Sequence, residues 1–134
     1  MDNDLLMKAS FLQKQAEELE QNIGVIDKEL AELNELDKNI SFLMASNGKS
    51  SISSIGKGIH VKTSIESKEL LVEVGAGVVV KKSPAQAREI IDNQITKLAE
   101  ARNQIMGKIE IYQRTFEDVV REIEESESKV LKNN

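Results

Sequence analysis

The chain has 134 residues, of which 31% are charged and 40% are apolar, and it carries a net charge of −5. The absence of cysteine excludes disulfides and thiolate metal sites and is compatible with a reducing, cytoplasmic compartment. An acidic chain without a basic stripe is a poor ligand for nucleic acid. No apolar run approaches the roughly 20 residues of a membrane span and the N-terminus lacks a basic region, so we expect neither membrane segment nor signal peptide.

Residues 1–45 carry apolar residues at alternating steps of three and four, a spacing typical of a coiled coil. These seam residues are Leu5, Ala9, Leu12, Ala16, Leu19, Ile23, Ile26, Leu30, Leu33, Ile40 and Met44. With Ala9 at heptad position a, Asp37 is the polar interruption of the seam. The pattern predicts a helix whose apolar stripe is narrower than that of a helix on an ordinary globule.

The next segment, residues 46–83, is a β-insert in which the apolar period changes to two. We predict strands near 58–65, 69–75 and 77–82 and a weaker strand near 51–56, paired as two β-hairpins. Its few apolar side chains cannot stabilise a four-stranded unit alone, and the edges of the sheet would be open to pairing. We therefore expect other subunits to complete the sheet.

A second coiled-coil helix is predicted over residues 84–134. Ser83 and Gln86 form a capping box around Pro84, which suits the first helical position. The seam residues are Ile91, Ile95, Leu98, Arg102, Ile105, Ile109, Tyr112, Phe116, Val119, Ile123, Ser126 and Val130. Two helices of similar length joined by a short insert favour an antiparallel hairpin, with a parallel intermolecular zipper as the alternative. In the hairpin, both chain ends meet at one tip.

No motif in the sequence supports catalysis. Gly56 and Gly58, like Gly75 and Gly77, are lone G-x-G pieces with no helix start after them, and we interpret them as bulges or tight turns. His60 is the only histidine, so a metal or nucleophilic site lacks partners. We expect the protein not to be an enzyme and to need no cofactor and no metal.

Apolar residues outside the seam gather near the two chain ends, where a coiled coil does not need them. They are Leu6, Met7 and Phe11 at positions e, f and c, and Val120 and Leu131 at e and b. Beside the seam residues Ile123 and Val130, they predict an apolar surface suited to non-native chains. The alternative is that they widen the seam and prevent fraying. A second off-seam group, Leu36, Phe42 and Leu43, is expected to pack on the β-insert.

Two segments of the insert and the start of the second helix carry a family resemblance. The segments are Ile55-Gly56-Lys57-Gly58-Ile59 and Val72 to Val80 (Val-Glu-Val-Gly-Ala-Gly-Val-Val-Val), and the helix starts with Ser83-Pro84. With the two helices, they resemble the alpha-type subunit of prefoldin along the whole chain. Ser54 departs from the family, which often has proline there. The resemblance implies one prefoldin-like domain over 1–134 of the α+β class. Its long antiparallel coiled-coil hairpin would hold two inserted β-hairpins that complete a β-barrel in the oligomer.

The resemblance also implies an archaeal, cytoplasmic, ATP-independent holdase chaperone. It implies a hexamer with prefoldin beta subunits, two alpha and four beta. This hexamer would capture unfolded client proteins at the coiled-coil tips and deliver them to a group II chaperonin. Neither nucleic acid nor a membrane is an implied partner. The implied client-binding residues are Leu5, Leu6, Met7, Phe11, Val120, Ile123, Val130 and Leu131. The implied barrel-lining residues are Ile59, Val61, Val72, Val74, Val78 and Val80. A coiled-coil scaffold or adaptor, or a homomeric filament-forming prefoldin-like protein, is the alternative.

Overall fold

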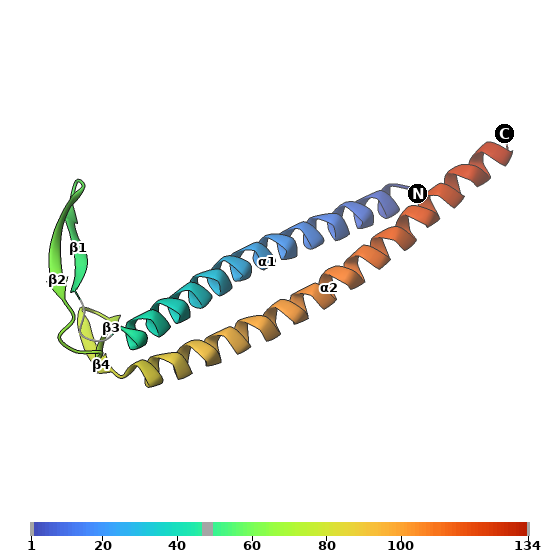
Figure 1. Ribbon diagram of the computed structural model, residues 1–134. Helices are drawn as coiled ribbons and strands as arrows, with labels where there is room; N and C mark the ends of the chain where they lie inside the picture. The colour runs from blue at the N-terminus through green and yellow to red at the C-terminus, as the bar shows by residue number, and fades with distance from the viewer. Residues whose placement is uncertain (1, 47–49, 134) are drawn as a thin grey trace. The chain divides into compact units, whose positions relative to one another are not determined.

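A computed structural model describes residues 2–46 and 50–133, with side chains over 3–46 and 50–132. The elements follow the order α1 (Asp2–Ala45), β1 (Ser50–Gly56), β2 (Ile59–Ser64), β3 (Leu70–Gly75), β4 (Val78–Lys82) and α2 (Pro84–Asn133) (Figure 1). The predicted helices and all four strands, including the weaker first one, are confirmed. Residues 47–49 of the predicted insert lie outside the described residues.

The chain forms two compact units. The helical unit contains Met1–Leu30 and Lys97–Asn134, and the sheet unit contains Ala31–Thr96. Each helix therefore has one stretch in the helical unit and another stretch in the sheet unit. The expectation of a single domain over the whole chain stays a prediction.

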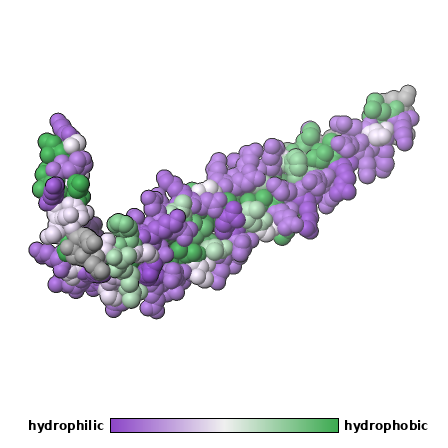
Figure 2. All heavy atoms as spheres, in the orientation of Figure 1, coloured by the Kyte–Doolittle hydropathy of each residue, from purple (hydrophilic) through white to green (hydrophobic). Residues whose placement is uncertain are grey.

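The helical unit is an antiparallel helix pair with a thin core. Ala9 and Leu12 of α1 are buried against Val119 of α2, whose exposed fraction is 2%. Four partly buried residues pack around this cluster: Leu5, Tyr112, Phe116 and Ile123. The start of α1 thus contacts the later part of α2, as the seams predicted for an antiparallel hairpin. Hydrophilic side chains cover most of the helical surface that Figure 2 shows.

The sheet unit holds two separate antiparallel hairpins, β1–β2 and β3–β4. Both turns have positive φ at their two central residues, 48° and 80° at Lys57-Gly58, and 50° and 75° at Ala76-Gly77. This is the geometry of a type I′ turn, whose twist matches that of the flanking strands. The register shifts at the glycine before each turn. The interpretation of both G-x-G pieces as bulges and tight turns is confirmed.

The helix ends in the sheet unit are capped by polar groups from neighbouring segments. The Ser83 N–H donates to Oε1 of Gln86 at 3.0 Å, and the Gln86 N–H donates to Oγ of Ser83 at 3.1 Å, which confirms the capping box. At the other end, α1 has no basic residue in its last turn. Instead Lys68 donates from Nζ to the Met44 carbonyl at 2.6 Å, so a cation from the insert satisfies a free carbonyl of the helix terminus.

One packing expectation in the sheet unit is wrong. Phe42, which we expected to pack on the insert, has an exposed fraction of 77%. Its heptad position f points away from a paired helix, and no strand covers it. Leu36 does face the insert, because it lines an apolar pocket of about 480 Å³ together with Leu70 and Leu71 of β3.

Candidate functional site

The eight predicted client-binding residues all lie in the helical unit, and the structure separates them into two groups. Leu5 and Ile123 pack against the buried cluster, and Val120 is half-buried. Leu5 and Ile123 therefore contribute to the helix pairing. The exposed group is Leu6, Met7, Phe11, Val130 and Leu131.

On α1, Met7 and Phe11 form one exposed apolar stripe. Met7 is 70% exposed and Phe11 is 57% exposed, and they stand four residues apart, so their side chains are neighbours on the helix surface. Leu6 is 52% exposed as well but lies on a different face of α1, because adjacent residues of a helix do not share a face. Exposed large apolar side chains that adjoin one another mark an interaction surface more often than scattered ones do.

On α2, the exposed residues lie beyond the paired stretch. Within the helical unit, α2 continues past the start of α1 (Figure 1). Val130, predicted as a seam residue, is therefore 51% exposed, and Leu131 is exposed as well. The structure does not pack these two side chains against α1. They are a second set of exposed apolar side chains, on α2 rather than on α1.

Three exposed large apolar residues of the described helical unit lie away from these surfaces: Val25, Met106 and Ile111. Val25 of α1 is 60% exposed and Ile111 of α2 is 63% exposed. They show that exposure alone does not define the candidate surface. They also provide matched controls, because their side chains are as accessible as those near the chain ends.

The six predicted barrel-lining residues lie on the two hairpins and differ in burial. Ile59 and Val61 of β2 are exposed, as are Val74 and Val78. Val72 is paired with Val80 across the second hairpin, and both are half-buried. Val72 and Val74 line the pocket that the β3–β4 hairpin forms with α1 and α2 of the sheet unit, so this face already has partners within the unit.

Sequence reasoning missed further exposed apolar residues on the strands. They are Ile52 and Ile55 of β1, Leu71 of β3 and Val79 of β4. Ile52 and Ile55 are the only apolar residues of a serine-rich strand, a contrast that could have identified them. A two-stranded hairpin is marginally stable in water, so this much exposed apolar surface on β1–β2 favours a covering partner (Figure 2).

Over 2–46 and 50–133, no group of three or more histidine, aspartate or glutamate side chains could hold a metal ion. The hydrogen bond from Arg102 to Asp27, with the negative charge of that carboxylate, raises the pKa of Arg102 above its ordinary value. Among the described residues, neither helix is long and apolar enough to cross a membrane.

Comparison with known proteins agrees with this architecture. The family model for prefoldin, described as "Prefoldin subunit", matches residues 12–129. "Prefoldin subunit alpha" of Methanosphaera stadtmanae is 25% identical over 65% of this chain and 63% of its own length. "Prefoldin subunit alpha 2" of Thermococcus kodakarensis is 30% identical over 58% of this chain and 56% of its own length. The chain thus spans less than two thirds of the length of either relative.

A solved structure confirms the fold. The filamentous PFD of Methanocaldococcus jannaschii, determined by cryo-EM, superposes with a TM-score of 0.72 at 21% identity, covering 87% of this chain and 98% of that one. The resemblance to the alpha-type subunit is confirmed by the curated relatives of that name. The chain belongs to the prefoldin family.

Proposed function

We propose that this protein is the alpha-type subunit of an ATP-independent holdase, and that it captures unfolded polypeptides on the exposed apolar residues near its chain ends. The observation that carries this proposal is the stripe of Met7 and Phe11, together with the exposed Leu6 on another face of α1. The helix pairing does not need these three side chains and leaves them accessible. Unfolded chains expose apolar side chains, and flexible residues such as methionine adapt to many of them. Single contacts of this kind are weak, so useful binding requires several subunits acting together.

Assembly is the second part of the proposal. The exposed strands would pair with prefoldin beta subunits in a hexamer of two alpha and four beta chains, and the captured client would pass to a group II chaperonin in the cytoplasm. Support comes from the apolar surface of β1–β2 and from family membership. No step of this function needs catalysis, a cofactor, nucleic acid or a membrane.

A homomeric filament is the competing assembly. It is favoured by one observation, the filamentous state of the structurally similar protein from Methanocaldococcus jannaschii. The mass and subunit ratio of the complex purified from its native source separate the two. A mixed complex with two kinds of subunit supports the hexamer, whereas a large homomer of this chain alone supports the filament.

The holdase activity is tested by diluting a chemically denatured client into buffer that contains the assembled complex and no nucleotide. Light scattering should rise more slowly than without the complex, for several unrelated clients. If the complex instead binds one folded partner saturably and leaves all denatured clients to aggregate, the chain is a scaffold or adaptor.

A further inference from the structure

A groove of about 540 Å³ lies between the two helices of the helical unit, beside the buried cluster. Its floor contains Ala16 of α1 and the rings of Tyr112 and Phe116 of α2. All three are seam residues and all three are only half-buried. Because the alanine methyl group is too small to cover two aromatic rings, the ring surfaces remain accessible from the groove.

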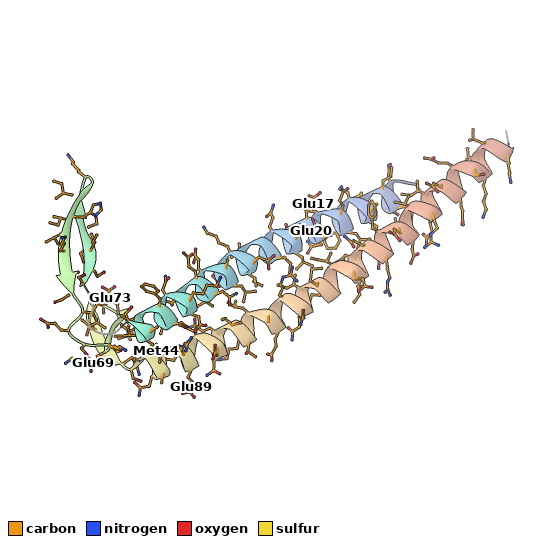
Figure 3. The ribbon with its side chains drawn as sticks, in the orientation of Figure 1. Glu17, Glu20, Met44, Glu69, Glu73 and Glu89 are labelled. Atoms are coloured by element: carbon orange, nitrogen blue, oxygen red, sulfur yellow. The ribbon has the colours of Figure 1, made fainter. Side chains whose placement is uncertain are left out.

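The rim of this groove is acidic. Glu17 and Glu20 of α1, both labelled in Figure 3, line it together with Glu117 of α2. The remaining polar lining residues are the amides Gln13 and Gln113, so none of the lysines and arginines that the structure describes lines the groove. A floor of aromatic rings under a rim of carboxylates combines two features that both attract a cation.

The three carboxylates also lack ion-pair partners within the described side chains, 3–46 and 50–132. The arginines nearest to Glu117 along α2 are engaged elsewhere, Arg114 with Glu110 and Arg121 with Asp118. The other ion pairs of this part of the chain involve neither Glu17 nor Glu20. The negative charge of the rim is therefore available to an external partner.

A metal ion is not the partner that this geometry fits. Nowhere in the described part of the chain do three acidic or histidine side chains approach closely enough to hold a metal. The carboxylates are instead distributed around the groove, on both helices. Such spacing suits a long organic cation, whose aliphatic part lies along the floor while its charge reaches the rim.

We propose that this groove selects segments of unfolded polypeptide in which a lysine or arginine adjoins apolar residues. The aliphatic stem and cationic head of that residue would lie over Tyr112 and Phe116, with the charge among Glu17, Glu20 and Glu117. Arginine is the better ligand, since its planar guanidinium stacks on aromatic rings and is weakly hydrated. This inference rests on the proposed holdase function and names the class of client segment that the helices prefer.

The test uses the assembled complex and fluorescent peptides that share one set of apolar residues and carry arginine, glutamine or glutamate between them. Anisotropy titrations at low salt should show the arginine peptide bound about fivefold more tightly than the glutamine peptide, and the glutamate peptide most weakly. In the variant Glu17→Gln/Glu20→Gln/Glu117→Gln, the preference for arginine over glutamine should fall below about twofold, with the glutamine peptide unaffected.

The matched control is Glu18→Gln/Glu100→Gln/Glu124→Gln, which removes the same charge from exposed positions of the same unit outside the groove. It should keep the full preference for arginine. The groove assignment is overturned if the first variant also keeps the preference for arginine. It is overturned as well if the control variant loses the preference equally, because the overall negative field of the protein is then the cause.

Failure of this proposal is distinguishable from failure of the holdase function. If the wild-type complex suppresses aggregation and binds all three peptides equally, the groove has no selectivity and the holdase function stands. If the complex binds none of the peptides and suppresses no aggregation, the holdase function itself is wrong. Equal melting temperatures of the wild type and both glutamine variants show that the substitutions leave the fold intact.

Discussion

Arg102 of α2 donates from Nε to Oδ1 of Asp27 on α1 at 2.7 Å, and a longer bond of 3.5 Å joins its Nη2 to Oδ2. Arg102 is one of the polar interruptions of the predicted seam, and the structure supplies its partner from the facing helix. The sheet unit repeats the arrangement, because Nε of Arg88 lies 3.2 Å from Oδ1 of Asp37. In both pairs the acid is on α1 and the arginine on α2.

This polarity explains why the hairpin is favoured over a parallel zipper of identical helices. Asp37 occupies position a of the first seam, so two parallel copies of α1 would place like charges opposite each other. Two parallel copies of α2 would do the same with Arg102. Only the pairing of α1 with α2 matches acid to base, which is how charged seam positions set partner choice and orientation in coiled coils.

Charge reversal at the first pair tests this relationship. Asp27→Arg places two guanidinium groups in contact and should lower the melting temperature, and Arg102→Asp should do the same with two carboxylates. The double variant restores an acid–base pair and should recover most of the loss. Thermal unfolding followed by circular dichroism measures all three. If the double variant loses as much melting temperature as the two single variants lose together, the pair does not interact.

The pH dependence of this pair follows from the raised pKa of Arg102. A group whose pKa is higher in the folded state stabilises the fold below its unfolded pKa, and the effect is lost only as the pH rises through the folded value. Arginine already titrates above the range in which proteins are studied. The difference in melting temperature between wild type and Arg102→Met should therefore stay constant from about pH 7 to about pH 10. A difference that vanishes across this range would contradict the account.

At the second pair, a double-mutant cycle with Asp37→Ala and Arg88→Ala should give a coupling free energy of about 0.2–1 kcal/mol. The pair is only partly buried, with side-chain exposures near one third, so water screens much of the attraction. Arg88 also donates to Oγ of Ser41. The variant Ser41→Ala should consequently reduce the measured coupling. Urea unfolding of the four proteins provides the free energies, and zero coupling would show that solvent satisfies both groups equally well.

The same substitution at two valines separates paired from unpaired seam positions. Val119→Ala removes two methyl groups from the most buried side chain of the helical cluster and should cost about 2 kcal/mol of unfolding free energy. Val130→Ala changes an exposed residue beyond the paired stretch and should cost less than about 0.5 kcal/mol. Chemical unfolding measures both. Equal costs would mean that the seam continues to Val130.

The fold could be predicted from the sequence wherever a short-range rule decides it. The heptad frame identified the face that buries Leu12 and Val119, and the capping box marked the start of α2. Glycine spacing located both type I′ turns, since positive φ is a local requirement. These features depend on residues that are neighbours in sequence.

Features that depend on the alignment of the two helices could not be predicted. A heptad frame shows which face a residue occupies, but not whether the partner helix reaches it, so Val130 was assigned to a seam that ends earlier. For the same reason the heptad frame could not show which residues pair with Asp37 and Arg102. The grouping of the unpaired carboxylates beside Tyr112 could not be predicted either, because the groove forms only when the two helices pack against each other.

The central claim is that exposed apolar residues near the chain ends, rather than exposed apolar residues in general, capture unfolded polypeptides. Its most direct test compares Leu6→Ser/Met7→Ser/Phe11→Ser with Val25→Ser/Ile111→Ser, both in the assembled complex, by the light scattering of a denatured client. The account predicts that the first variant loses most of its suppression of aggregation while the second retains it. Equal suppression by both variants would contradict it.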